Sequence, residues 1–435
     1  MPDLINQITE KKPKAFSNIL LHLHPAAVSE ESISFTRTFG LGGMAALLIV
    51  IQFITGILLR FYYEPFPQKA YDSILILHNN VLFGQLVRNI HHWSGVFLVL
   101  IVFLHLLRVF LTGAYQSPRQ VNWIIGLILF ALVIFSNFTG YLLPWDQLAY
   151  WAVTVSTSIL QYIPLVGNSL REFVISGTEV NAETLIVFYT FHTAVLPILI
   201  LLLMAYHFWR VRKSGGVLIP QSSEPKKMVS TYPNLVYKEG VVALVLIAVI
   251  LVFAVFFNAP LLDRANPSFS LNPTKAPWYF AGIQELLMHF HPLFAGFLIP
   301  LALIVLIAFI PFFKYEVELT GMWFVSYKGK KSAKLSAMFA VAITIFLVLL
   351  NEYLINFETL LPWLNPVISN GIIPLLIVLT IIWIYSKYIS KKFKLSFSEL
   401  VQSIFVLIIT SFVVLTLINI FFRGTNMQLI FPWNL

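Results

Sequence analysis

The stretch that decides the fold is residues 84–111, which read GQLVRNIHHWSGVFLVLIVFLHLLRVFL. It exceeds the roughly 20 apolar residues that cross a bilayer as one helix. Within it, His91 and His105 stand fourteen residues apart. At 3.6 residues per turn and 1.5 Å per residue, this step is nearly four turns, or about 21 Å, along almost one face. The stretch therefore predicts a transmembrane helix with one imidazole near each membrane surface.

The whole chain has the composition of a membrane protein. Of its 435 residues, 58% are hydrophobic and only 11% are charged, whereas soluble domains carry about 25% charged residues. This balance excludes a soluble globular enzyme, a disordered chain and a collagen-like fibre. The sequence contains no cysteine, which excludes disulfides, thiolate-ligated iron–sulfur clusters and thioether-attached haem on this chain.

Apolar runs long enough to span a bilayer occur nine times, and in a bilayer they must be helices because every backbone polar group needs an internal partner. The predicted fold class is therefore all-α, a polytopic membrane protein. A basic stretch at residues 212–234 divides the chain into predicted domains 1–220, a four-helix bundle, and 221–435, with five further helices. The predicted spans are residues 41–63, 84–111, 123–142, 185–211, 241–257, 293–313, 335–352, 372–386 and 401–422.

The distribution of charge predicts the orientation of these spans. Of the 28 Lys and Arg residues, 21 fall on the side of the N-terminus, so the two sides carry net charges of +12 and −3. Cytoplasmic loops of membrane proteins are enriched in Lys and Arg. We therefore expect a multi-pass protein of a bacterial cytoplasmic membrane, with its N-terminus in the cytoplasm and its C-terminus outside. The net charge of +9 then gives no indication of nucleic-acid binding.

A second predicted helix, residues 185–211, repeats the two-histidine pattern. It carries His192 and His207, fifteen residues apart. Both helices start on the outer side, so His91 lies level with His192, and His105 level with His207. Two facing imidazoles form the axial ligand set of a six-coordinate haem, and helix bundles build such sites from facing side chains. The pattern indicates two haems stacked across the membrane, with hydrogen bonding between helices as the alternative role of these histidines.

Cations and glycines accompany the histidines. Arg88 and Arg108 each lie three residues from a histidine, toward the nearer membrane surface, where haem propionates need a cation. Arg108 could equally anchor the topology. Glycine lets a flat ligand or a neighbouring helix approach the backbone closely. Pairs of glycines repeat the fourteen-residue spacing in the first and third spans: Gly42, Gly56, Gly126 and Gly140.

The sequence also contains the motifs RNIHHW at 88–93, HLLRVFLTG at 105–113, GYLLPWDQ at 140–147, YW at 150–151 and HTAVLP at 192–197. Together these motifs resemble cytochrome b of the quinol–cytochrome c and plastoquinol–plastocyanin oxidoreductases, the cytochrome bc complexes. The resemblance covers roughly residues 35–320, and the fifteen-residue histidine step is similar to the chloroplast-type branch. Here the two parts of that branch are fused, and a ninth span follows, which we expect to pack against a partner or lipid.

The resemblance implies two b-type haems in the N-terminal domain. His91 and His192 would ligate the outer, low-potential haem, and His105 and His207 the inner, high-potential haem. Chloroplast-type chains also carry a cysteine before the glycines of the first span, but that position is Gly40 here. We therefore expect no covalent c-type haem on this chain.

A quinol-oxidation site in the C-terminal domain is also implied. The family's Pro-Glu-Trp-Tyr motif reads APWY at 276–279 here, and Pro277 cannot take a proton in place of the motif's glutamate. We expect Glu285 to serve instead, because burial can tune a carboxylate toward neutral pKa. A solvated loop acid is the alternative role. The expected catalytic residues are Glu285, Tyr279 and Tyr141, and Trp278 is expected to bind quinol.

At the cytoplasmic end of the fourth span, Arg212 and Lys213 are expected to bind quinone at an inner site. The resemblance implies quinol oxidation that bifurcates electrons and translocates protons. The implied partners are a Rieske iron–sulfur protein, a c-type or multihaem cytochrome, quinone, lipids and a second copy of the complex. Two alternatives stay open: a non-bifurcating di-haem anchor between quinone and a periplasmic cytochrome or dehydrogenase, and a proton-coupled transporter whose histidines relay protons.

Overall fold

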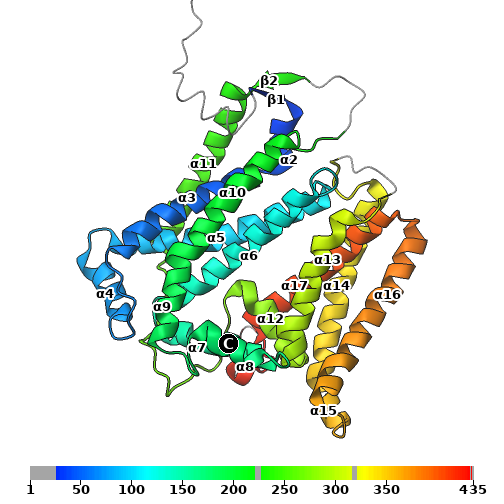
Figure 1. Cartoon of the computed structure of the whole chain (residues 1–435). Coiled ribbons are helices and arrows are strands. Elements are labelled where there is room, and N and C mark those ends of the chain that lie inside the picture. The colour runs from blue at the N-terminus through cyan, green and yellow to red at the C-terminus, as the bar shows by residue number, and fades with distance from the viewer. Residues whose placement is uncertain (1–25, 221–226, 316–320, 432, 434–435) are drawn as a thin grey trace, which may run out of the picture.

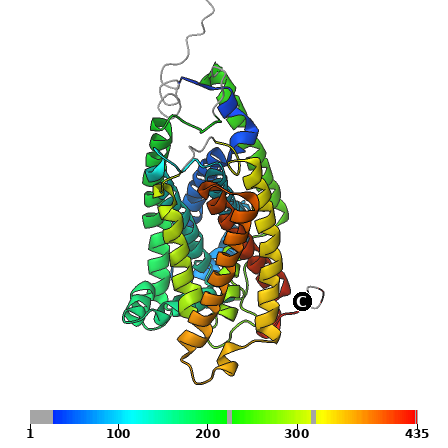
Figure 2. The same cartoon turned by 90° about the vertical axis from the view of Figure 1, so that its right-hand side faces the viewer.

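The computed structural model describes residues 26–220, 227–315, 321–431 and 433. Within those ranges, nine helical segments are long and apolar enough to cross a membrane, so all nine predicted spans are confirmed. They run side by side, with connecting segments at both ends (Figures 1 and 2). The segments are α3 (Leu41–Arg60), α5 (Gly84–Leu111), α6 (Gln120–Leu142), α9 (Ala182–Thr190) with η4 (Phe191–Val195) and α10 (Leu196–Lys213), α11 (Thr231–Phe256), η5 (Phe294–Leu298) with α13 (Ile299–Phe309) and η6 (Ile310–Phe312), α14 (Tyr327–Tyr353), η7 (Ile368–Ile372) with α16 (Ile373–Phe393), and α17 (Phe397–Phe422).

Shorter elements occupy the two ends of the spans. At one end, β1 (Ala27–Ser29) pairs antiparallel with β2 (Met228–Ser230), and the opposite end carries α7, α8 and α15 (Figure 1). We call these the β end and the α7 end. The remaining elements are η2 (Glu31–Ile33), α2 (Phe35–Thr38), α4 (Ala70–Asn80), α7 (Gln147–Ser158), η3 (Ile159–Tyr162), α8 (Gly167–Ile175), α12 (Trp278–His289), α15 (Phe357–Leu360) and η8 (Thr425–Met427).

Three spans contain a π-helical turn, and in each case a proline follows within two residues. These turns are η4, η5 and η7, and the prolines are Pro197, Pro300 and Pro374. A proline inside a helix removes one N–H donor and crowds the carbonyl of the preceding turn. A π turn closes i to i+5 hydrogen bonds and so holds one more residue than an α turn. The extra residue lets each span continue past its proline.

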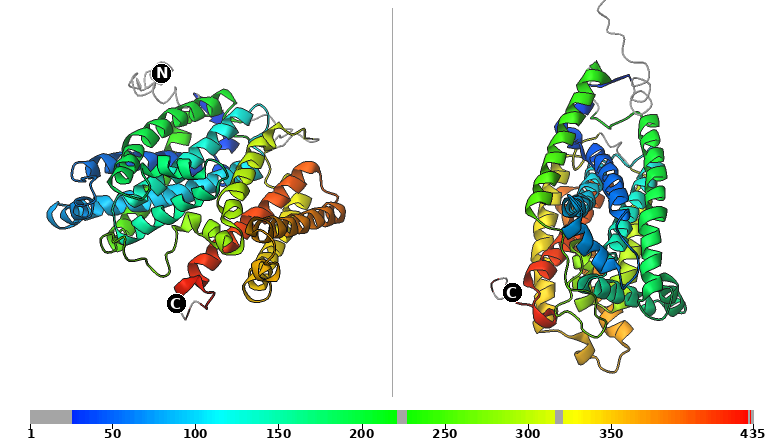
Figure 3. Two further views of the ribbon diagram at one scale, coloured as in Figure 1. Left: turned by 60° about the horizontal axis from the view of Figure 1, so that its bottom comes forward. Right: turned by 90° about the vertical axis from the view of Figure 1, so that its left-hand side faces the viewer.

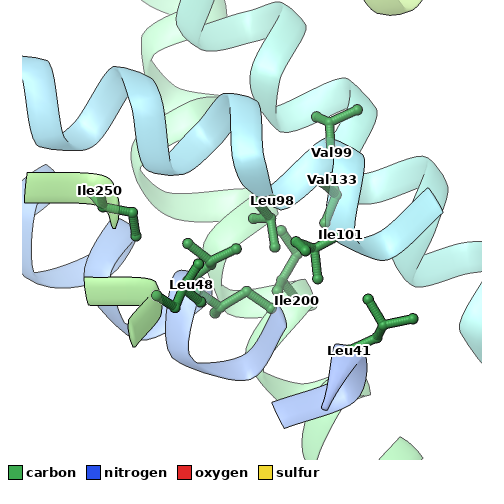
Figure 4. Close-up of a cluster of buried hydrophobic side chains, with 10 residues drawn as sticks. Leu41, Leu48, Leu98, Val99, Ile101, Val133, Ile200 and Ile250 are labelled. Atoms are coloured by element: carbon green, nitrogen blue, oxygen red, sulfur yellow. The ribbon is translucent and has the colours of Figure 1, made fainter. Parts of the chain in front are cut away.

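Five helices, rather than the predicted four, share the core of the first bundle. Leu48 of α3, Leu98 of α5, Val133 of α6, Ile200 of α10 and Ile250 of α11 are buried against one another (Figure 4). The predicted domain boundary assigned α11 to the second domain. In the structure α11 packs on α3 and α5 instead, because its apolar stripe completes this cluster.

The ninth span, α17, lies at the centre of the second group of helices, beside α14 and α12 (Figure 3). It also contacts the first bundle, since the ring of Phe405 stacks on Phe110 of α5 with 3.9 Å between centroids. Gln402 donates a hydrogen bond to the carbonyl of Phe110 at 3.1 Å. The expectation that this span packs on a partner or on lipid is wrong for this face of α17, which packs within the chain.

Gly282 of α12 tests the packing between α12 and α17. A Cβ at this position would lie 2.7 Å from both Phe412 and Thr416 of α17, and such overpacking costs about 1–3 kcal/mol. We expect Gly282→Ala to lower the thermal unfolding midpoint of the purified protein. Gly240→Ala on α11 is the matched control, because a Cβ there meets nothing within 4 Å. Equal midpoints for the two variants would contradict this packing.

Candidate functional site

The four predicted histidines meet in two pairs inside the first bundle. The ring centroids of His91 (α5) and His192 (η4) are 6.1 Å apart. A metal bound at about 2 Å to one nitrogen of each ring would place the ring centres about 6 Å apart. His105 (α5) and His207 (α10) interact nearer the β end. The structure thus brings together the residues that were predicted to pair, at two levels of the bundle.

Oxygen atoms of neighbouring residues lie within hydrogen-bonding distance of Nδ1 in both rings of the His91–His192 pair. Nδ1 of His91 lies 2.8 Å from the hydroxyl of Thr55. Nδ1 of His192 lies 3.0 Å from the carbonyl of Ser136 and 3.3 Å from the hydroxyl of Thr139. A neutral imidazole that donates from Nδ1 presents the lone pair of Nε2 to a metal. In both rings Nδ1 is thus engaged, and Nε2 is the nitrogen available to a metal; ligation by this pair stays a prediction.

Thr55 and Thr139 were not predicted, although the sequence carries a signal for them. Each threonine directly precedes a predicted glycine, so a Thr-Gly step occurs at 55–56 and again at 139–140. These two glycines belong to the level of the His91–His192 pair. The repeated step indicates a shared task, in which threonine orients an imidazole and glycine clears space beside it.

Each of the four predicted glycines faces a different imidazole. A Cβ at Gly140 would stand 2.5 Å from Cε1 of His192, and a Cβ at Gly56 would stand 3.3 Å from Cε1 of His91. A side chain at Gly140 would collide with its ring, and one at Gly56 would press on its ring, so glycine at both positions leaves room beside the imidazoles. The donor set and the cleared space fit a porphyrin iron with two axial imidazoles. At the other level a Cβ at Gly42 would lie 3.5 Å from Cε1 of His105, and a Cβ at Gly126 would lie 3.6 Å from Cε1 of His207, both ordinary van der Waals distances.

The π turn η4 explains why the second histidine step is one residue longer than the first. His192 lies inside this turn, and a π turn contains one residue more than an α turn. Fifteen residues from His192 to His207 therefore cover about the same height as fourteen residues from His91 to His105. The insertion keeps both histidine pairs level.

The two predicted propionate partners are buried and hydrogen-bonded to the backbone. The guanidinium of Arg88 donates to the carbonyls of Ala259 at 3.0 Å and Pro260 at 2.6 Å. Arg108 donates from Nε to the carbonyl of Arg37 at 3.0 Å. Arg88 thereby ties α5 to the segment that leads toward α12. The predicted contacts of both arginines with haem propionates stay a prediction.

The start of α12 lies against the first bundle. Trp278 and Tyr279 pack on the cluster around Leu48. The ring of Phe280 meets Phe138 of α6 edge-on, with 5.7 Å between centroids. Burial, and then the neighbouring Tyr141, raise the pKa of the Tyr279 phenol. The structure therefore brings Tyr279 and Tyr141 together, as a shared site requires.

Glu285 faces a different part of the molecule. Its carboxylate is fully buried and lies 2.6 Å from the guanidinium of Arg423. Burial acts to raise the pKa of Glu285, but hydrogen bonds from His289 and Arg423 outweigh it and hold that pKa below its usual value. The expected tuning toward neutral pKa is therefore wrong, because the ion pair stabilises the charged carboxylate.

At the end of α10, the predicted inner-site cations are engaged by other groups. Nζ of Lys213 lies 4.9 Å from the ring centroid of Trp209, and Arg212 also has an interaction partner. Arg119, which was not predicted, donates to the carbonyls of Ser214 at 2.9 Å and Gly216 at 2.7 Å. These contacts order the end of α10, and quinone binding by Arg212 and Lys213 stays a prediction.

Comparison with known proteins identifies the family. A family model described as Cytochrome b/b6/petB matches residues 28–215. Cytochrome b6 of Heliomicrobium gestii is 42% identical over 177 residues, which are 41% of this chain and 83% of that protein. Cytochrome b6 of Acaryochloris marina is 44% identical over 175 residues, covering 40% of this chain and 81% of that protein. The chain belongs to the cytochrome b/b6 family.

The cytochrome b fold also extends beyond the part covered by that family model. A solved structure named Hyperthermophilic respiratory Complex III matches with a TM-score of 0.66 and 24% identity, covering 94% of this chain and 100% of that one. As a cytochrome b/b6 family member, the chain is a multi-pass membrane protein that binds b-type haem and transfers electrons across the membrane. The family does not support the transporter alternative.

Gly140 gives a direct test of the His91–His192 site. In Gly140→Ala the new Cβ collides with the imidazole of His192, so that ring must turn away from its partner. We expect the reduced-minus-oxidised spectrum of the purified protein to lose about half of its b-type absorption, the share of one of two haems. Gly43→Ala is the control, since a Cβ there meets nothing within 4 Å. Unchanged absorption in Gly140→Ala would contradict this geometry.

The threonine hydroxyls give a second test. Loss of a partner that orients a metal-ligating histidine costs about 10–100-fold in metal affinity. We expect Thr55→Val and Thr139→Val to release haem from the His91–His192 site more readily, measured by spectral titration of the purified protein with a haem-scavenging globin. Thr190→Val is the control, because Thr190 is exposed and donates only to the carbonyl of Ile186 in its own helix. If all three variants retain haem equally, the threonines do not orient the rings.

Proposed function

We propose that this chain is the quinone-reactive di-haem subunit of a quinol:cytochrome c-type oxidoreductase. The observation that carries the proposal is the two-level arrangement of imidazole pairs, each ring facing its own glycine. In this proposal His91 and His192 hold one haem, and His105 and His207 hold the other. Bound haem supplies one-electron chemistry, while the protein supplies ligands, orientation and electrostatics.

The orientation follows from the charge distribution. The side with net charge +12 corresponds to the β end, so the β end faces the cytoplasm and the α7 end faces outside. The His91–His192 pair is then the outer pair. Quinol oxidation near the start of α12 would release protons outside, and quinone reduction near the end of α10 would take up protons inside. Electron transfer between the two levels would therefore be coupled to proton translocation.

The start of α12 presents, among the described residues, an unpaired hydrogen-bond donor, which supports an outer quinol site there. Nε1 of Trp278 is buried and has no hydrogen-bond partner within the described part of the chain. Buried N–H groups without partners are rare in folded proteins. We infer that Trp278 donates to an oxygen of the quinol ring, with Tyr279 and Tyr141 beside it. Glu285 enters this proposal as an ion-paired carboxylate, and its role is tested below.

At the inner end, Arg212 and Lys213 would attract the quinone and stabilise negative charge as it is reduced. The outer acceptor in this proposal is a Rieske iron–sulfur protein or a c-type cytochrome that docks at the α7 end. Membrane lipids and a second copy of the complex complete the set of proposed partners.

An alternative function is that of a di-haem anchor, which oxidises quinol without bifurcation. The proline at position 277 favours this alternative. Pro277 is the residue before the first turn of α12, where it can begin the helix but cannot accept a proton. Adding an inhibitor of the inner site separates the two functions. In a bifurcating complex the b haems become over-reduced while the external acceptor is turning over. In a simple conduit their reduction level follows the quinol pool.

Removing one ligand from each pair tests the proposal. We expect His192→Ala and His207→Ala each to lose one haem, and only the His192→Ala variant to lose reduction of the remaining haem by quinol from the outer side. The measurement is the rate of b-haem reduction by a short-chain quinol in proteoliposomes with the inner site inhibited. Absence of b-type absorption from the unmodified protein would refute the proposal outright.

A further inference from the structure

A buried cluster of charged groups lies where α12, α14 and α17 meet. The side chains of Arg423 and Glu285 are both 0% exposed, and Nη2 of the arginine lies 2.6 Å from Oε1 of the carboxylate. From Nη1, Arg423 donates to the carboxylate of Glu352 at 3.0 Å and to the carbonyl of Met427 at 2.9 Å. One guanidinium therefore joins the end of α17 to α12 and α14.

Two further polar side chains complete the set around Glu285. Asn419 of α17 donates to Oε2 at 3.4 Å, and Nε2 of His289 lies 3.1 Å from Oε1. Nδ1 of His289 in turn lies 2.7 Å from Oδ1 of Asn351 on α14. The carboxylate thus has direct hydrogen-bond partners from α12 and α17, and α14 is linked to it through His289 and Arg423. Breaking a buried ion pair by removing one partner is strongly destabilising, because it leaves an uncompensated buried charge.

The cluster lies on the face of α12 that points away from the first bundle. Phe280 contacts α6 through Phe138, and Gly282 faces Phe412 of α17. Glu285 follows Phe280 by five residues, which is about 140° around the helix. One face of α12 is therefore held against the bundle by aromatic contacts, and the other is held against α17 by the ion pair.

We propose that Arg423 is a positioning residue of the quinol-oxidation site, which fixes α12 and with it Trp278 and Tyr279. The identity of that site rests on the proposed function above. The ninth span contributes by carrying the guanidinium to α12. Glu285 acts as the anchor for Arg423 on α12 rather than as the proton acceptor in place of Pro277.

Spin labels test the position of α12 without any need for turnover. The chain has no cysteine, so labels attach only where cysteines are introduced. Met288→Cys on α12 and Tyr353→Cys on α14 occupy positions that are 42% and 65% exposed. We expect a narrow distance distribution in this pair and a broad or shifted one when Arg423→Gln is added. Lys69→Gln is the control, because Lys69 pairs with Glu64 at the exposed surface. A distribution unchanged by Arg423→Gln would overturn the proposal.

Kinetics then separate positioning from proton acceptance. An apolar pair of similar volume can often replace a buried ion pair, whereas Arg423→Met alone leaves Glu285 buried and unpaired. Glu352, the other partner of Arg423, is 23% exposed and keeps access to solvent in both variants. We expect Arg423→Met to raise KM for quinol about tenfold, with a smaller fall in kcat, while the spectrum of both haems is retained. The double variant Glu285→Met/Arg423→Met should recover to within about threefold of the unmodified protein, with the same pH profile.

The two hypotheses for Glu285 give opposite results in the double variant. If the carboxylate accepts the proton from quinol, the double variant stays inactive or its pH profile changes, and the positioning role is overturned. If the unmodified protein does not oxidise quinol, the proposed function fails, while the spin-label distances still decide whether Arg423 fixes α12. If Arg423→Met loses both haems, the double variant and the spin-label pair decide the question.

Discussion

The orientation of imidazole rings in a low-dielectric bundle is the constraint on which the first half of the molecule depends. A polar ring buried among apolar helices is costly unless its nitrogens have partners. Thr55, Ser136 and Thr139 supply oxygen atoms to Nδ1 of the His91–His192 pair. Only Nε2 of each ring then remains for a metal. Gly56 and Gly140, which directly follow the two threonines in α3 and α6, leave room beside the rings.

Helix geometry carries the same arrangement to the second level. The rise of the helix sets the number of residues between two histidines at fixed heights. Pro197 in the fourth span would disturb that spacing. The π turn at Phe191–Val195 absorbs the proline by adding one residue, and the longer sequence step compensates for it. A local irregularity in the backbone therefore preserves a regular spacing between the two histidine pairs.

The second half of the molecule positions a single short helix. α12 lies between the first bundle and α17, with aromatic rings on one face and the Glu285–Arg423 pair on the other. α14 and α17 hold this face of α12 in place, although neither helix carries a family motif. Helices α14 and α17, which carry no sequence motif, thus determine the position of the loop motif at residues 276–279.

The sequence by itself determined the nine spans, the pairing of the four histidines and the glycines beside them. These features repeat with the helical period, so spacing along the chain predicts them, and residues 84–111 match α5 at both ends. Only the tertiary structure decided that α11 joins the first bundle and that Arg423 binds Glu285, 138 residues away. The expected pKa shift of Glu285 was wrong for the same reason. An ion pair between distant segments leaves no periodic signal, and its effect on the carboxylate depends on which groups the fold brings to it.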